Sequence, residues 1–360
     1  MAFEYFDNML GLVGEANLLE TGFNVSRPND PTDGLLNDEL TDNIMAKWHY
    51  IASEYQIPQM AQFHAFDTVA QKSVRAPIDQ KAVEKGLIKV KRPMTELLYE
   101  LSNRGVTQER ELFEYVMDDI VELADEVVTR TKVLKNELLS TGKVTINENN
   151  LSLTVDYGVP AGNLALTLDF GAGAEADLPT QLQAIVDRAA DYGVAINGMV
   201  CARATLSKMR ANKAIQKAIN GVYAEGILTT NSALLSYLDT EFGISRVVVN
   251  DLSYSLPWEV GSNGRPVTNI QRYFPKDRVT FFGTGNGMRL GTGLWGIPPE
   301  EQISRFGNVV QSARNPYVYV HQWCEDDPAV VWTKASGLFM PVLFNPNSLY
   351  VASVAETPGA

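Results

Sequence analysis

The sequence predicts an α+β protein in which one long helix accompanies strands and a separate α/β lobe follows it. Three observations support this prediction. Apolar residues recur every three or four positions from Thr107 to about Ser140, helix and strand patterns alternate between residues 179 and 283, and strand patterns return from residue 312 onward. A chain of 360 residues with this order is expected to form two or three structural units.

The composition is that of a folded protein. Hydrophobic residues make up 45% of the chain and charged residues 20%, with apolar stretches along its whole length. Cys201 and Cys324 are too few and too far apart for a disulfide framework or a C-x-x-C site. No apolar run approaches the roughly 20 residues that cross a bilayer, and Glu4 and Asp7 stand where a secretory signal needs positive charge. We expect a soluble chain made in the cytosol, with no membrane partner.

Negative charge is concentrated at the N-terminus. Residues 1–46 contain nine Asp and Glu and one basic residue, Arg27, with the turn formers "RPNDPTDG" in the middle. We expect residues 1–48 to form an extended arm that gains order by lying on another surface, with free disorder as the alternative. The net charge of −13 argues against general affinity for nucleic acid, because phosphate binding depends on clustered Lys and Arg.

The charge inverts in the next segment. Its basic residues are Lys72, Arg75, Lys81, Lys85, Lys89, Lys91 and Arg92, against three acidic ones between Phe63 and Arg92. The pieces "FDTVAQKSV" (66–74) and "GLIKVKR" (86–92) partly alternate polar and apolar residues, as half-buried strands do. We predict a long, basic, two-stranded excursion within residues 49–98.

The most regular feature is the helix expected over residues 107–140. Its mostly apolar stripe consists of Leu112, Val116, Ile120, Leu123, Val127, Thr131, Leu134 and Leu138. Thr107 suits its start, and Thr141 with Gly142 suits its end. Acidic residues come early and basic ones late, which complements the helix dipole. A coiled-coil segment is the alternative, but the chain offers no second long helix to pair with.

Shorter elements follow this helix. The stretch "GKVTINENNLSLTVDYG" predicts two strands around an Asn-rich turn. Helices are expected at 179–192, 205–219 and 231–241, with strands at 194–201 and in "RVVVND" and "DRVTFFG". Alternation at this spacing indicates a compact α/β lobe. The C-terminal run predicts further strands, two of them joined by the acidic turn "CEDDP".

The glycine-rich stretch "FFGTGNGMRLGTGLWG", residues 281–296, is the strongest candidate for a nucleotide site. Gly291 and Gly296 have P-loop spacing, but the Lys and the hydroxyl residue that must follow are missing. With Gly293 they also fit G-x-G-x-x-G, yet the strand before and the helix after that this motif requires are not indicated. We interpret the stretch as a flexible loop where chains approach closely.

Other candidates for chemistry are equally incomplete. His49, His64 and His321 are scattered, without an H-E-x-x-H pair to hold zinc, and there is no G-x-S-x-G nucleophile elbow. The acidic run at 325–327 could bind a hard cation, although adjacent carboxylates before a proline usually solvate a hairpin turn. We predict no enzyme activity, no catalytic or metal site and no cofactor.

The order of these features resembles the tailed-bacteriophage major capsid proteins of the lambda-like E family, whose fold herpesvirus shells share. The stretches "ELLSTGKVTI", "VDYGVP", "MRLGTGLWGIPPEE" and "ARNPYVYVHQWCEDDPAVVWTKASGLFMPVLFNPNSLYVASV" look like that family. The resemblance covers essentially the full length. It implies an N-arm at 1–48 and an extended β-hairpin loop at 49–98. A peripheral domain would follow at 99–178, with a spine helix at 107–140, and would be completed by C-terminal strands at 312–360. An α/β axial domain would occupy 179–311 and include the glycine-rich stretch.

The resemblance also implies a function. Copies of the chain would assemble in the host bacterial cytoplasm into pentamers and hexamers of an icosahedral head shell around double-stranded DNA, with scaffolding, portal and decoration proteins as partners. About 48 residues leave no room for the cleavable scaffolding segment of some relatives, so we expect either a matured chain or a separate scaffold. An encapsulin-type nanocompartment shell and a cytosolic enzyme built on the α/β lobe are the alternatives.

The charges suggest where subunits meet. We hypothesise that the seven basic residues of the excursion lie on an acidic surface of a neighbour, either its arm or the early part of its long helix. The helix residues in question are Glu111, Glu114, Asp118 and Asp119. Complementary potentials would set the register and speed of association. A solvated basic hairpin is the alternative.

Overall fold

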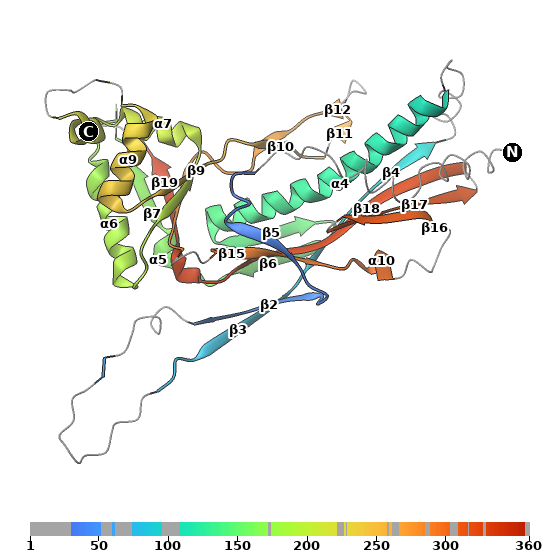
Figure 1. Ribbon diagram of the computed structural model, residues 1–360, viewed down its shortest axis with the longest axis horizontal. Helices are drawn as coiled ribbons and strands as arrows, with labels where there is room; N and C mark the ends of the chain where they lie inside the picture. The colour runs from blue at the N-terminus through green and yellow to red at the C-terminus, as the bar shows by residue number, and fades with distance from the viewer. Residues whose placement is uncertain are drawn as a thin grey trace, which may run out of the picture.

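The computed structural model describes most of the chain. The described residues are 30–51, 60–61, 74–95, 108–171, 174–221, 227, 229–257, 259–260, 266–284, 289–302, 309–315, 317–326 and 329–356. For several of these, among them 108–119 and 309–315, only the backbone is described. They form a sheet with a long helix beside it, a smaller lobe at one end, and a projecting pair of strands (Figure 1).

The larger unit, which we call the sheet body, is a six-stranded mixed sheet with helix α4 (Gln108–Thr141) along one face. Its strands are β1 (Leu36–Leu40), β4 (Gly86–Thr95), β15 (Gly291–Gly296), β16 (Val309–Asn315), β17 (Val318–Asp326) and β18 (Ala329–Leu343). The long strand β18 pairs with β4, β15 and β17, and β1 runs parallel to β15. The sheet therefore joins segments from both ends of the chain.

Helix α4 confirms the predicted apolar stripe. Ile120, Leu123, Val127, Leu134 and Leu138 are all buried in one core cluster with side chains from the sheet. The helix ends as its sequence predicts, because Gly142 takes a φ of 69° and its N–H donates to the Leu138 carbonyl at 2.9 Å. The burial of a continuous face on a sheet explains why this long helix needs no coiled-coil partner.

The second unit, the lobe, is a five-stranded sheet in the order β7-β19-β14-β8-β9. Its strands are β7 (Leu166–Asp169), β8 (Gly198–Cys201), β9 (Arg246–Val249), β14 (Arg278–Phe282) and β19 (Leu349–Ala355). Its helices are α6 (Leu178–Asp191), α7 (Arg203–Ala211), α8 (Lys213–Asn220) and α9 (Asn231–Phe242). A core cluster of its own confirms the predicted α/β lobe.

Two details of the lobe differ from the sequence-based expectation. The helix expected at 205–219 is two helices, because Asn212 leaves helical geometry and its side chain accepts from the Ile215 N–H at 3.2 Å, which starts α8. Strand β19 pairs with β14 and β7, so these last residues belong to the lobe sheet rather than to the other C-terminal strands. A short 3-10 turn at Pro346–Ser348 precedes this crossing.

The glycine-rich stretch differs most from its interpretation as a loop in the axial lobe. Its second half is β15, a strand of the sheet body between β1 and β18. A Cβ on Gly296 would approach the Leu338 Cδ2 atom to 2.6 Å, and one on Gly291 would collide with the Val342 carbonyl oxygen. Glycine stands here because neighbouring chain segments leave no room for a side chain.

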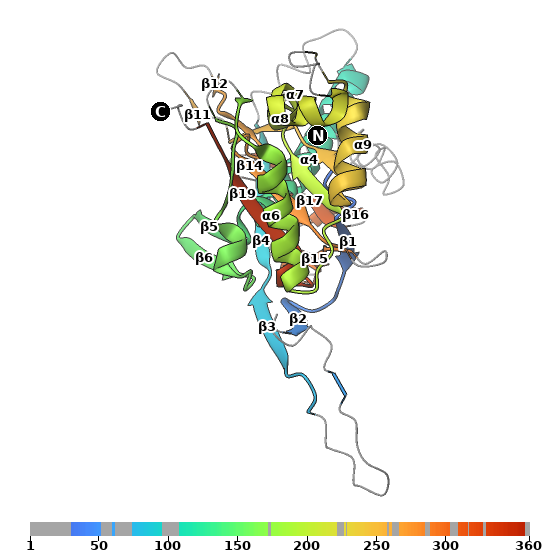
Figure 2. The same ribbon diagram turned by 90° about the vertical axis from the view of Figure 1, so that its left-hand side faces the viewer.

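The projecting pair, which we call the ribbon, consists of β2 (Met45–Ile51) and β3 (Ile78–Glu84). It extends away from the rest of the protein in both views (Figures 1 and 2). The prediction paired 66–74 with 86–92. Residues 66–73 lie outside the described residues, and 86–92 belongs to β4 in the sheet body. A two-stranded excursion is present, but its described strands are not the predicted ones.

Smaller elements complete the description. The Asn-rich turn is confirmed between β5 (Lys143–Glu148) and β6 (Leu151–Asp156), where Asn149 and Asn150 both have positive φ. The remaining pieces are α5 (Ala161–Leu164), α10 (Pro299–Gln302), β10 (Ser253–Ser255), β11 (Glu259–Val260), β12 (Pro266–Val267) and β13 (Ile270–Arg272). Among the described residues, no helix combines the length and apolar character that crossing a bilayer requires.

Candidate assembly site

Within the described residues, the ribbon is attached to the sheet body at its root, around Trp48. There the Trp48 and Tyr157 rings stack with centroids 5.5 Å apart, and the Tyr157 hydroxyl donates to the Pro341 carbonyl at 2.6 Å. Both aromatic side chains are buried, and burial raises the pKa of Tyr157. Beyond this root the two strands pair with each other, and Val74 and Ile78 are 78% and 67% exposed.

Lys85 fixes the direction in which the ribbon leaves the body. It is the single residue between β3 and β4, and it is only 3% exposed. Its ammonium donates to the carbonyls of Asn43 at 2.7 Å, Trp295 at 2.9 Å and Thr41 at 3.3 Å. Burial lowers its pKa to about 8, although nearby Asp42 acts in the opposite direction. One cation thus ties three chain segments together where the ribbon begins.

The other predicted contact cations near the root also have partners in their own chain. Lys81 donates to the Asp156 carbonyl at 2.7 Å and Lys89 pairs with Glu300 at 2.7 Å. The Lys91 ammonium lies 3.9 Å from the centroid of a Trp332 ring. These lysines therefore support the protein's own structure, whatever they contact in an assembly.

Arg92 and the predicted acidic residues lie along the long helix. Arg92 pairs with Glu122 at 2.5 Å and Glu126 at 3.3 Å of α4, so it binds its own helix. Arg75 lies just before β3 and is exposed, whereas Lys72 lies outside the described residues. Glu111, Glu114, Asp118 and Asp119 lie in the first half of α4, where the side chains are not described. Their contacts with a neighbour stay a prediction.

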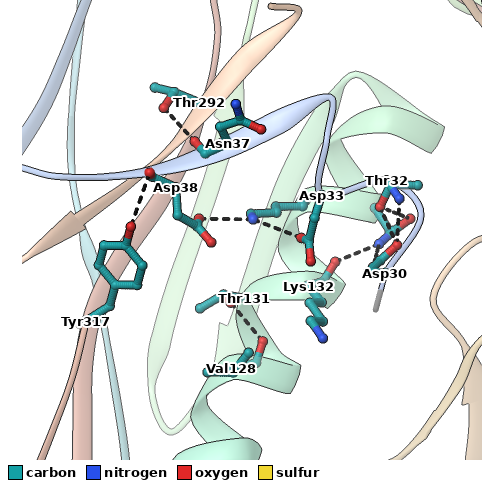
Figure 3. A network of polar contacts seen from close by, with 12 residues as sticks. Asp30, Thr32, Asp33, Asn37, Asp38, Val128, Thr131, Lys132, Thr292 and Tyr317 are labelled. Carbon is teal, nitrogen blue, oxygen red and sulfur yellow. Dashed lines mark hydrogen bonds and ion pairs between the residues drawn. The ribbon is translucent and has the colours of Figure 1, made fainter. Parts of the chain in front are cut away.

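Sequence reasoning missed a second feature, the arm root, which we define as residues 30–40. Asp30 is 2% exposed and accepts hydrogen bonds from the side chains of Asn136 in α4 and Asn250 after β9, both at 3.0 Å. Thr32 donates to the same carboxylate through its N–H and its hydroxyl, at 2.9 and 2.7 Å. Figure 3 shows this carboxylate among its partners. One side chain thus connects the arm, the long helix and the lobe.

Lys135 forms the second anchor of the arm root. This lysine, 2% exposed, pairs with Asp38 at 2.9 Å and Asp33 at 3.1 Å. Figure 3 labels these two aspartates. Burial raises the pKa of Asp38, and the Lys135 ammonium opposes that rise. A Cβ on Gly293 would meet Phe339 at 2.8 Å and would collide with the Asp38 carboxylate, so this glycine makes room for the ion pair.

The arm root shows on which surface part of the predicted arm lies. Residues 1–48 were expected to gain order by lying on another surface, and 30–40 pack on the body of their own subunit, with Leu35 and Leu36 buried in the main core. Residues 1–29 lie outside the described part. A sequence signal was available, because Lys135 and Asn136 stand next to Leu134 of the mostly apolar stripe, where buried charged or amide groups need partners.

The described residues do not form a recognisable catalytic centre. Within them no group of three His, Cys, Asp or Glu side chains is placed to hold a metal ion. Burial raises the pKa of the Cys201 thiol to about 12, and burial, with a smaller contribution from Lys334, lowers the pKa of His321 to about 4. Glu300 is held by Lys334 and Lys89, which outweigh the effect of burial and lower its pKa to about 2.

A sequence model of the family described as phage major capsid protein E matches residues 52–354. This chain belongs to that family. The capsid protein is also similar in structure to a prophage capsid protein from E. coli CFT073, with 13% identity, a TM-score of 0.53 and 98% of each chain covered. A phage-related protein from Bordetella bronchiseptica RB50 gives 9% identity and a TM-score of 0.50 over 93% of this chain and 95% of that one. A search of curated proteins finds no match.

The family match confirms the resemblance noted from the sequence, and the structural similarity confirms the fold. The capsid protein is a structural subunit of a tailed-phage head shell, and its place is the virion. This family favours a phage shell over an encapsulin-type compartment. The domain boundaries drawn from the sequence stay predictions, and the strands β7 and β19 show that the lobe takes residues from outside 179–311.

Proposed function

We propose that each capsid protein lays its ribbon on a neighbouring subunit, and that pentamers and hexamers joined in this way close into an icosahedral shell around double-stranded DNA. Repetition of one such contact around a rotation axis builds a ring, and rings joined by symmetry close a shell. The ribbon supplies the reach because it extends well beyond the sheet body (Figures 1 and 2).

The observation that carries the proposal is the exposure of the ribbon. A two-stranded hairpin is at best marginally stable in water on its own, and a third strand or a packed face is needed to stabilise it. In this subunit Val74 and Ile78 face solvent, and the described part of the ribbon packs on its own body only at Trp48 and its surroundings. A neighbour's surface would cover these apolar side chains.

Charge supports the same arrangement but with fewer residues than the sequence suggested. Lys85 and Arg92 are occupied by their own subunit, whereas Arg75 is exposed just before β3. Lys72, three residues earlier in the sequence, lies outside the described residues, and we propose it as a second contact cation. Their acidic counterpart would be residues 1–29 or the first half of α4 of the next copy. Such complementary potentials act mainly on association rate and register.

Other partners follow from the proposed role. The net charge of −13 suits a container for DNA, because a basic lining would bind the packaged phosphates strongly. We infer that scaffolding, portal and decoration proteins are its partners during assembly or in the finished shell. Copurification from infected or induced cells tests this part.

The experiment for the main proposal is particle assembly followed by negative-stain microscopy. The wild-type protein is expected to form closed particles tens of nanometres across. The variant Lys72→Glu with Arg75→Glu should give far fewer particles, while its subunits melt at the wild-type temperature. A control, Lys143→Glu with Arg289→Glu, reverses two exposed cations outside the ribbon and should assemble normally. Equal yields for the ribbon variant and the wild type would contradict the ribbon contact.

A further inference from the structure

The lobe separates its charges between two ends. The basic end consists of Arg203, Lys208, Arg210, Lys213 and Lys217 in α7 and α8, two helices without any Asp or Glu. The acidic end contains Asp187 and Asp191 in the C-terminal half of α6, and Asp239 and Glu241 near the end of α9. One cation, Arg188 in the last turn of α6, lies among them and donates to the Asn163 side chain at 3.1 Å. All four of these acidic side chains are exposed. A protein with net charge −13 thus keeps one distinctly basic surface.

The two ends lie apart because α6 and α9 both start at the basic end. Asn212, between α7 and α8, donates to the carbonyls of Ala174 and Ala176 just before α6, at 3.1 and 2.9 Å. Arg210 donates to Asn231, the first residue of α9, at 3.0 Å. A helix rises 1.5 Å per residue, so the acidic side chains lie roughly 12 to 20 Å further along. Figure 2 shows α6 and α9 running away from α7 and α8.

Four of these charges are placed against the dipoles of their own helices. Helices α7 and α8 each begin with a cation, Arg203 and Lys213, and have no acidic residue in the first turn. The remaining cations of the basic end lie in the last turns of α7 and α8, where the dipole favours them. Helix α9 carries Asp239 and Glu241 near its end and has no basic residue in its last turn. The helix dipoles therefore do not account for Arg203, Lys213 and the two acids of α9, whereas a complementary surface on another molecule does.

Contacts within the subunit neutralise each end only in part. Arg203 pairs with Asp251 at 3.1 Å yet remains 79% exposed, and Lys213 pairs with Glu175 at 2.6 Å. Lys208 pairs with Glu356 at 2.8 Å, and these two side chains are 39% and 59% exposed. In the described part of the chain, Asp191, Asp239 and Glu241 have no cation within ion-pair distance.

The surface of α9 is also suited to burial against another protein. Leu235 is 38% exposed and lies one turn before Asp239, on the same side of the helix. Ser232 and Ser236 beside it are exposed and short, so covering them costs little side-chain entropy. An apolar centre with charges at its margin is the usual composition of a protein interface.

We propose that the basic end of one lobe docks on the acidic end of the lobe of the next copy, in a head-to-tail contact that repeats around a closed ring. The contact is heterologous, because different surfaces of the two copies meet, and it closes when its rotation divides a full turn. This inference rests on the proposed function, since it requires several lobes to meet around one axis. It adds the surfaces that meet and the charges that align them.

The test is a charge swap across the contact. Arg203→Glu with Lys213→Glu reverses the basic end, and Asp239→Lys with Glu241→Lys reverses the acidic end. Each change agrees with the dipole of its own helix, so the subunits should remain folded. Each double variant alone is expected to lower particle yield roughly tenfold or more at low salt, because like charges then meet. The quadruple variant should recover yield to within about threefold of wild type.

Controls separate this inference from the proposed function. The variant Lys143→Glu with Arg289→Glu makes the same change in net charge at two exposed, ion-paired cations outside both ends, and should assemble like wild type. Thermal melting verifies that every variant folds. Wild-type yield from both single-end variants, or no recovery in a folded quadruple variant, would overturn the inference while leaving the shell function intact. A wild-type protein that forms no particles would instead refute the proposed function, and with it this contact.

Discussion

The arm root and the ribbon follow one another in the chain, yet they differ in the burial of their side chains. The arm root turns Asp30, Asp33 and Asp38 toward α4 and satisfies them with partners from α4, from the residue after β9 and from its own turn. The ribbon buries Ala46 and Trp48 near its base, next to the buried Lys85, and leaves Ile78 67% exposed. The first segment is fixed by its own subunit, and the second is available to another.

This difference has an energetic basis. A buried carboxylate or ammonium costs several kcal/mol when it loses a partner, so the arm root has one permitted arrangement. An exposed strand pair loses little stabilising free energy when it bends or shifts, because water satisfies its polar groups. A subunit built in this way has a rigid body and one adaptable extension. Substitutions in the two segments should therefore differ in their effect on the stability of the subunit.

Removing Asp30 should cause the largest loss of stability. Asp30→Ala removes a buried acceptor shared by Asn136, Asn250 and Thr32, and each of these side chains keeps one other acceptor. We expect the free energy of unfolding to fall by about 3 kcal/mol. Urea denaturation of the isolated subunit measures it. Asp42→Ala, at an exposed position in the turn before the ribbon, is the control and should change it by less than about 0.5 kcal/mol.

A methyl group at Gly293 should destabilise the arm root through steric clashes. Its Cβ would meet Asp38, Phe339 and Lys135, which are all packed. We expect Gly293→Ala to cost about 2 kcal/mol. At Gly86, beside the ribbon, a Cβ would make ordinary contacts at 3.6 Å, and Gly86→Ala should be nearly neutral. Equal melting temperatures for the two variants would show that the arm root is less tightly packed than its geometry indicates.

Substitution of Lys85 should lower the free energy of unfolding by a smaller amount, which depends on pH. Lys85→Met removes the donor to three carbonyls but also removes a buried charge, so we expect a loss of about 1 kcal/mol at pH 7. The pKa of Lys85 is lowered to about 8 in the folded protein, so the unfolded chain binds more protons between pH 8 and 10.5. The stability of wild type relative to the variant should therefore rise across that range. Chemical denaturation at pH 7 and pH 10 compares the two.

The smallest effect on the subunit is expected at the exposed apolar residues of the ribbon. Ile78→Thr keeps a branched side chain in the strand and removes apolar surface that already faces water. Its free energy of unfolding should stay within about 0.5 kcal/mol of wild type. Particle yield should nevertheless fall. If yield is unchanged while the Asp30 variant assembles poorly, the arm root rather than the ribbon would be the segment that governs assembly.

Several elements could be predicted from the sequence because local patterns define them. The long helix, its end at Gly142, the Asn-rich turn and the helices of the lobe all depend on short-range periodicity or turn chemistry. The strand partners were predicted less well. Residues 86–92 alternate like a hairpin strand, but β18, far along the chain, provides their hydrogen bonds. The glycine-rich strand β15 was missed because its glycines serve contacts with β1 and β18.

The predicted contact residues show the same limit. The sequence identified a run of cations, and the structure divides it by burial: Lys85 is enclosed by carbonyls, Arg92 lies on α4, and Arg75 is exposed. Spacing along a strand indicates alternation but not which neighbour will cover each side. Charge inversion along the chain indicated an extended appendage, and only the fold distinguishes the cations that stabilise it from those that remain exposed.

By itself the sequence determined the long helix, the α/β lobe and the membership of a capsid family, because these depend on periodicity, local turns and the order of segments. Only the tertiary structure decided that residues 30–40 belong to their own subunit, that β19 completes the lobe, and that Lys85 and Lys135 are anchors. The physical reason is that pairing and desolvation depend on segments distant in the chain. The sequence is the same whether a charged residue is exposed or buried, and the residues around it in the fold determine its pKa and its partners.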